Sequence, residues 1–126
     1  MRVGIFGTGI TTSSASHLNE MLDEVGIEHF NLNSKTKSKK ADCIIVMGGD
    51  KGVRNYFHRT FDSSIPVLGI NESESDGFLA QVDLKQFATY AKRLKKMDYH
   101  VEEVPRLGVK IDGKSAYPVL NDVAVF

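Results

Sequence analysis

"DCIIVMGGDKGVRN", residues 42–55, changes character abruptly after Met47. Residues 43–47 are apolar without interruption, which is typical of a strand buried on both faces at the centre of a parallel sheet. The strand stops at Gly48-Gly49-Asp50, and a helical stretch is expected from near Gly52. The carboxyl end of a central strand is where open α/β sheets bind ligands, so we expect a binding site here.

The residue types at this point suit a phosphate ligand. Glycines let backbone N–H groups approach phosphate oxygens without a Cβ between them, and the positive end of the following helix favours an anion. Asp50 has two possible chemical roles, accepting a proton from a hydroxyl or holding a metal that is bound to phosphates. The structural alternative is an Asx-type turn that caps the helix.

Strands and helices alternate on both sides of this stretch. Strands are predicted at residues 3–6, 27–32, 42–47 and 65–70. Asp83 is expected to cap the third helix, with Gln86 completing a capping box. The predicted inward-facing helix positions are Ala15, Leu18, Met21, Leu22 and Val25, then Val53, Phe57 and Phe61, then Leu84, Phe87, Ala88, Ala91 and Leu94. This alternation predicts a right-handed, parallel α/β layer.

The pattern changes after Met97, where only strand-like segments follow, at residues 99–104, 106–111 and 120–126. Asp112-Gly113 is a strong signal for a two-residue hairpin turn. We therefore predict an α/β fold with a parallel Rossmann-like sheet and flanking helices over residues 1–97. The first strands of a β-rich second domain follow at 98–126, and the chain is expected to stop within it, because so few strands alone make a poor domain.

Composition excludes several classes of protein. Sixteen basic and sixteen acidic residues give zero net charge, which argues against a general nucleic-acid binder. The single cysteine, Cys43, cannot form an internal disulfide and is expected in the core of a protein from a reducing compartment. Without an apolar run of membrane-spanning length or a signal pattern, a cytoplasmic protein with no membrane partner is expected.

Other motifs are weaker. "GTGITT", residues 7–12, lacks the third glycine of a dinucleotide fingerprint, and an ordinary strand-to-helix turn explains it better. The four histidines show no metal-binding spacing. The basic run at residues 35–40 is explained by a solvated loop better than by phosphate contacts.

Five segments in order carry a resemblance to a known family: "MGGD" (47–50), "IPVLGIN" (65–71), "GFL" (77–79), "YHVEEVPRLGVKI" (99–111) and "LNDVAV" (120–125). From about residue 41 to residue 126 the chain resembles the NAD kinases. The resemblance implies phosphorylation of the 2′-hydroxyl of the adenosine ribose of NAD, with ATP or another phosphoryl donor and with Mg²⁺ or another divalent cation. Diacylglycerol and sphingosine kinases share the G-G-D loop, but the "LNDV" segment favours the NAD kinases.

Site residues follow from the resemblance. Asp50 matches the family's catalytic aspartate, and Phe78 matches an aromatic residue that contacts the dinucleotide. Asn121 and Asp122 match a pair that grips the adenosine of NAD. The cofactor-binding positions thus predicted are Gly48, Gly49, Lys51, Gly52, Asn71, Phe78, Asn121 and Asp122. No protein ligand to a metal is assigned.

The chain departs from the family pattern in two loops. Lys51 stands where the family has glycine, and its ammonium either contacts a phosphate or is simply solvated. A glycine position that needs positive φ would cost lysine about 1 kcal/mol or more. The segment after Asn71 adds Glu72, Glu74 and Asp76, which either bind Mg²⁺ or face solvent.

The resulting hypothesis is an NAD kinase, acting on NAD and ATP as small-molecule partners, without nucleic acid, and assembled as a homodimer or homotetramer. The alternative is a non-catalytic module of the same superfamily that binds NAD(P) or a nucleotide. Lys51 and the early end of the sequence are the features that favour this module.

Overall fold

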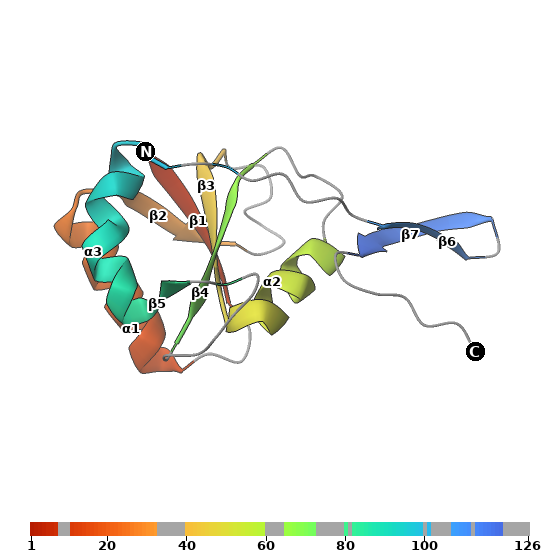
Figure 1. Ribbon diagram of the computed structural model, residues 1–126, viewed down its shortest axis with the longest axis horizontal. Coiled ribbons are helices and arrows are strands. Elements are labelled where there is room, and N and C mark those ends of the chain that lie inside the picture. The colour runs from red at the N-terminus through yellow and green to blue at the C-terminus, as the bar shows by residue number, and fades with distance from the viewer. Residues whose placement is uncertain are drawn as a thin grey trace.

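The computed structural model describes residues 1–7, 11–32, 40–59, 65–72, 80, 82–99, 101, 107–111 and 113–119, and the statements below concern these residues. Helices are interspersed among the strands up to Lys95, as the sequence predicts (Figure 1). The elements are β1 (Arg2–Gly7), α1 (Thr12–Glu24), β2 (Glu28–Asn31), β3 (Cys43–Met47), α2 (Gly49–His58), β4 (Val67–Asn71), β5 (Val82–Asp83), α3 (Leu84–Lys95), β6 (Leu107–Ile111) and β7 (Lys114–Val119).

The first five strands form one parallel sheet in the order β2-β1-β3-β4-β5. All five residues of β3 are buried, so the central position predicted for this strand is confirmed. From β1 the chain first adds β2 on one side and then crosses to add β3 on the other. The strand order therefore reverses between β1 and β3, and such a switch point opens a crevice at the carboxyl edge of the sheet.

Helices cover both faces of the sheet, which confirms the predicted α/β fold. Helices α1 and α3 lie on one face and α2 lies on the other (Figure 1). The larger core contains Leu18, Leu22 and Phe87 with side chains from the strands, whereas Val53 and Ile44 belong to the smaller core. The apolar helical spacing in the sequence corresponds to these two buried stripes.

The helix ends follow from identifiable residues. The Thr11 hydroxyl caps α1 by accepting from the Ser14 N–H at 3.2 Å. Asp83 and Gln86 form both bonds of the predicted capping box at the start of α3. At the other end of α3, Met97 has φ of 56°, in the left-handed region where glycine is usual.

Two details of α3 and of the sheet differ from the sequence prediction, and Phe61, predicted to face the core, lies outside the described residues. Ala88 is exposed, because the buried stripe of α3 follows Leu84, Phe87, Ala91 and Leu94 and leaves position 88 at its edge. The two-residue strand β5 was not predicted, since a strand of that length has no detectable alternation.

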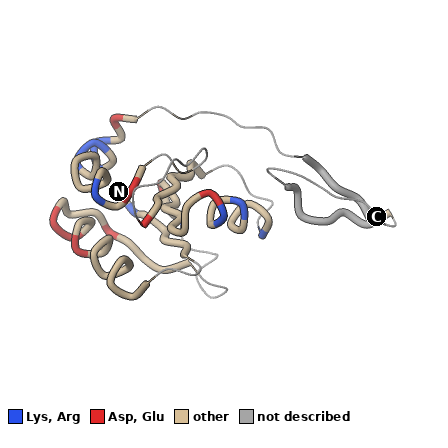
Figure 2. The backbone as a smooth tube through the Cα atoms, turned by 60° about the horizontal axis from the view of Figure 1, so that its bottom comes forward, with Lys and Arg blue, Asp and Glu red and all other residues tan. Residues whose placement is uncertain are grey.

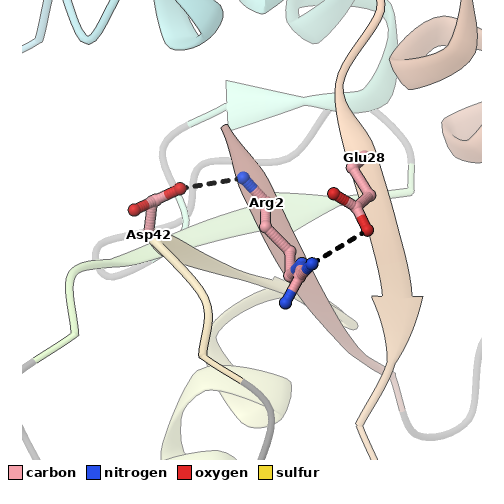
Figure 3. Close-up of polar contacts among 3 residues, drawn as sticks. All are labelled: Arg2, Glu28 and Asp42. Atoms are coloured by element: carbon pink, nitrogen blue, oxygen red, sulfur yellow. Dashed lines mark hydrogen bonds and ion pairs between the residues drawn. The ribbon is translucent and has the colours of Figure 1, made fainter.

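Polar contacts join three strands at the amino edge of the sheet (Figure 3). The backbone N–H of Arg2 donates to Asp42 Oδ2 at 2.8 Å, and the Arg2 guanidinium lies 3.1 Å from Glu28 Oε1. The side chains of Arg2 and Glu28 are 43% and 66% exposed. These contacts hold β1 against β2 and the start of β3.

Strands β6 and β7 form a separate antiparallel pair, and β7 approaches α2 (Figure 1). Gly113 has φ of 78° in the turn, consistent with the predicted hairpin. Tyr99 and Val101 are not in a strand, and residues 120–126, predicted as one, lie outside the described residues. No helix in the described ranges is long and apolar enough to cross a membrane.

Candidate functional site

Helix α2 starts directly after β3, at Gly49 rather than near Gly52 as predicted. Gly48 and Gly49 have φ of 106° and 67°, in the left-handed region that glycine adopts readily. These two residues turn the chain from strand to helix without an intervening loop. Asp50 and Lys51 consequently lie in the first turn of α2, at the carboxyl edge of the sheet.

Two of the glycines are also required by the packing of the protein itself. A Cβ on Gly49 would clash with the side-chain oxygen of Asn71, and a Cβ on Gly52 would clash with the backbone carbonyl of Met47. The missing side chains thus let α2 pack closely on β3 and β4. The same packing places the N-terminal N–H groups of α2, which have no carbonyl of their own helix to bond, at the end of the central strand.

Asp50 is half-buried, and its carboxylate faces the chain that enters β5. Asp50 Oδ1 accepts from the backbone N–H of Ala80 at 2.8 Å. A carboxylate in the first turn of a helix is stabilised by the helix dipole. The contact with Ala80 joins residues thirty positions apart, which an Asx-type turn within the loop does not explain.

Lys51 is exposed on α2 and has an ordinary helical backbone. Met97 is the only non-glycine with positive φ among the described residues. Lysine would strain the loop only at a position with positive φ, and Lys51 is not at such a position. The left-handed positions are occupied by the two glycines before it, and the Lys51 ammonium extends from the first turn of α2.

Asn71, the last residue of β4, is 7% exposed. Its Nδ2 donates to the carbonyl of Ala80 at 2.5 Å. Ala80 itself is fully buried. Two of the predicted site residues, Asn71 and Asp50, therefore both bind the backbone of Ala80. The sequence did not indicate Ala80, because any residue type has the backbone groups that make these contacts.

Glu72 links the end of β4 to the start of α1. Its Oε2 accepts from the Ser14 hydroxyl at 3.0 Å and lies 3.3 Å from Thr11 Oγ1. The sequence did not predict this contact, which joins residues about sixty positions apart. Glu74 and Asp76 lie outside the described residues. In the part of the chain that the structure describes, no three His, Cys, Asp or Glu side chains gather to hold a metal.

Three other predicted binding residues, Phe78, Asn121 and Asp122, also lie outside the described residues, and their roles stay predictions. Within the described part, the structure brings Gly48, Gly49, Asp50, Lys51, Gly52 and Asn71 together at the carboxyl edge of the sheet. This group lies beside the switch point between β1 and β3.

The sequence matches known proteins across most of its length. A model of the ATP-NAD kinase N-terminal domain matches residues 9–99. An NAD kinase from Methanopyrus kandleri is 34% identical over 104 residues, covering 82% of this chain and 37% of the relative. An NAD kinase from Thermococcus kodakarensis is 38% identical over 85 residues, covering 67% of this chain and 30% of the relative. The chain thus spans about a third of these relatives.

Solved structures share the fold. An NAD kinase from Archaeoglobus fulgidus in complex with ATP matches with a TM-score of 0.62 and 22% identity, over 86% of this chain and 41% of that one. A yeast NADH kinase complexed with NADH matches with a TM-score of 0.67 and 14% identity, over 94% of this chain and 46% of that one.

Proposed function

The chain belongs to the ATP-NAD kinase family, and we propose that its carboxyl-edge site transfers a phosphoryl group from ATP to the 2′-hydroxyl of the adenosine ribose of NAD, giving NADP. One observation carries the proposal. Asp50 is held on the first turn of α2, at the carboxyl end of the central strand and beside the switch point.

Asp50 is proposed as the proton acceptor. A secondary hydroxyl is a poor nucleophile, and a positioned carboxylate that takes its proton accelerates attack by about 10²–10⁴-fold. The ribose oxygen then bonds to the γ-phosphorus, the bond to the ADP oxygen breaks, and ADP leaves. The remaining requirements of phosphoryl transfer are positioning and neutralisation of charge.

The start of α2 is proposed to receive the phosphates. Its N-terminal N–H groups and helix dipole favour an anion. Gly48, Gly49 and Gly52 shape the turn that presents these groups, and the exposed Lys51 ammonium extends from the same turn. Because the backbone at Lys51 is helical, a phosphate contact by this side chain needs no rearrangement of the loop.

Mg²⁺ is proposed to accompany ATP. Magnesium usually retains several waters and uses one or two carboxylates together with substrate phosphates, so the lack of a larger acidic group among the described residues suits this mode. Asp50 is taken as the proton acceptor, so no described side chain is assigned to the ion. When bound, Mg²⁺ would supply positive charge to the transferring phosphoryl group.

The wider assignments are also proposals. Phe78, Asn121 and Asp122 would contact the dinucleotide, and residues 98–126 would begin a second, β-rich domain after the α/β domain of residues 1–97. Basic positions gather on α3 and acidic ones towards the end of α1 (Figure 2). Their equal numbers in the whole sequence leave no net charge, which supports small-molecule substrates rather than nucleic acid. A homo-oligomer is proposed from the family resemblance, and a cytoplasmic location stays an expectation from the sequence.

Replacing Asp50 tests the proposed function. In the full-length protein, Asp50→Asn should lower the kcat for NAD phosphorylation by about 100-fold or more, because the amide cannot accept the proton. The matched control is Asp83→Asn, the same substitution at a buried carboxylate that caps α3, where asparagine caps equally well.

Near-normal turnover in the Asp50 variant would exclude Asp50 as the proton acceptor. A native protein that binds NAD but transfers no phosphate would instead support the alternative, a non-catalytic nucleotide-binding module.

A further inference from the structure

The backbone of Ala80 is held from both sides by side chains of the site. Its N–H donates to Asp50 Oδ1 at 2.8 Å, and its carbonyl accepts from Asn71 Nδ2 at 2.5 Å. Asp50 comes from α2 and Asn71 from the end of β4. Ala80 thus connects the two side chains through its own backbone groups.

Asn71 has little access to a ligand in this arrangement. It is 7% exposed, its Nδ2 is bonded to Ala80, and its Oδ1 lies against Gly49, where a Cβ would clash with it. A buried amide whose nitrogen and oxygen both contact the protein can hold neighbouring segments in place, and little of it is left exposed to bind a ligand. This differs from the direct cofactor contact that the sequence predicted for Asn71.

The orientation of the Asp50 carboxylate depends on this contact. An N–H bond to one carboxylate oxygen favours orientations in which the N–H lies near the plane of the group, and so it restrains the direction of the other oxygen. The position of the Ala80 N–H depends in turn on where its carbonyl is anchored. Because Ala80 is fully buried, water has no access to its N–H and C=O groups in this arrangement.

We propose that Asn71 is a positioning residue for phosphoryl transfer, which fixes the Ala80 backbone and, through it, the carboxylate of Asp50. The inference rests on the proposed function, in which Asp50 accepts the proton. It assigns Asn71 no contact with substrate. Displacement of a reacting group by about 1 Å can reduce a rate by about 100-fold, so a residue of this kind has a measurable effect on kcat.

A double-mutant cycle in the full-length protein separates positioning from general stability. Asn71→Ala should lower kcat by about 10- to 100-fold while KM for ATP changes by less than about threefold. In the Asp50→Asn background the same substitution should have almost no further effect, because the group that it positions is already absent. Equal losses of kcat in both backgrounds would overturn the proposal.

Hydrogen exchange at the Ala80 amide gives a readout that does not require activity. Asn71→Ala should accelerate exchange at Ala80 by about tenfold or more, while amides of β3 stay protected. If Ala80 stays protected, the proposal is wrong, even if the protein proves to be a kinase. If Ala80 is released in a protein that transfers no phosphate, the proposed function fails but the structural link between Asn71 and Ala80 stands.

Two further variants control for folding. Asn71→Leu keeps most of the side-chain volume but removes both polar atoms, and it should behave as Asn71→Ala does. Asp83→Ala removes another buried polar side chain, the α3 cap, and should lower thermal stability without changing kcat. Loss of protection throughout the sheet in both Asn71 variants would make Asn71 a general structural residue and overturn the proposal.

Discussion

The two edges of the parallel sheet are both tied by polar contacts, yet the contacts differ in kind. At the amino edge, the exposed side chains of Arg2 and Glu28 form an ion pair, and the backbone N–H of Arg2 donates to the exposed Asp42 carboxylate (Figure 3). At the carboxyl edge, Asn71 and Asp50 bind the backbone of the fully buried Ala80. The first set lies in water, whereas the second is centred on backbone groups of Ala80 that water does not reach.

This difference decides how well each set of contacts fixes geometry. An exposed ion pair contributes about 0–1 kcal/mol, because both partners are almost as well solvated apart. A buried hydrogen bond has no such substitute, and losing one partner costs about 1–3 kcal/mol. The carboxyl edge therefore holds the Asp50 carboxylate more firmly than the amino edge holds its exposed ion pair.

The largest effect on stability is expected from Gly52→Ala at the carboxyl edge. The added Cβ would meet the carbonyl of Met47, which is backbone and cannot move aside. Overpacking of this kind costs about 1–3 kcal/mol of unfolding free energy. Urea denaturation measures it, with Lys85→Ala at an exposed position of α3 as the control. A change below about 0.5 kcal/mol would mean that α2 adjusts easily on β3.

The parts of the fold that were predicted correctly are those with a distinctive local sequence pattern. The central place of β3 followed from five consecutive apolar residues, and the α3 cap from Asp83 and Gln86. The start of α2 was placed three residues too late, because Gly48-Gly49 resembles a loop until its left-handed turn is known.

The sequence indicated where the candidate site lies, and the roles of its residues stay predictions. Residue type and position indicated Asp50 and its glycines, since a carboxylate at the end of a central strand suggests chemistry. The bonds of Asp50 and Asn71 to Ala80 span thirty and nine positions, and one partner in each is a backbone group. Such contacts arise only from the packing of α2 against β4, which no local pattern in the sequence encodes.

A smaller effect is expected from Lys51→Gly, which tests whether exposed charge matters at the carboxyl edge. If the ammonium contacts a phosphate, ATP affinity should fall by about two- to fivefold, and the loss should shrink at higher salt. Lys51→Gln, which removes the charge without adding a flexible glycine, should lose affinity equally. Steady-state kinetics at two salt concentrations measure both variants. A gain in turnover for Lys51→Gly at both would show that lysine hinders the site.

The smallest change in unfolding free energy is expected from a substitution at the amino edge. Glu28→Gln removes the exposed ion pair with Arg2 and should change the unfolding free energy by less than about 0.5 kcal/mol. Kinase activity should not change, because the pair lies at the opposite edge from Asp50. A loss of more than about 1 kcal/mol, measured by the same urea titration, would contradict the contrast between the two edges.

Cys43, at the start of the buried strand β3, gives the protein an internal reporter of sheet opening. Burial, with a smaller contribution from the charge of Asp42, raises the pKa of its thiol to about 11 from 9.0. Near neutral pH the folded protein therefore has about 100-fold less of the reactive thiolate than a free cysteine. As the chain contains one cysteine, its rate of alkylation measures how often the central strand becomes accessible, without any introduced label.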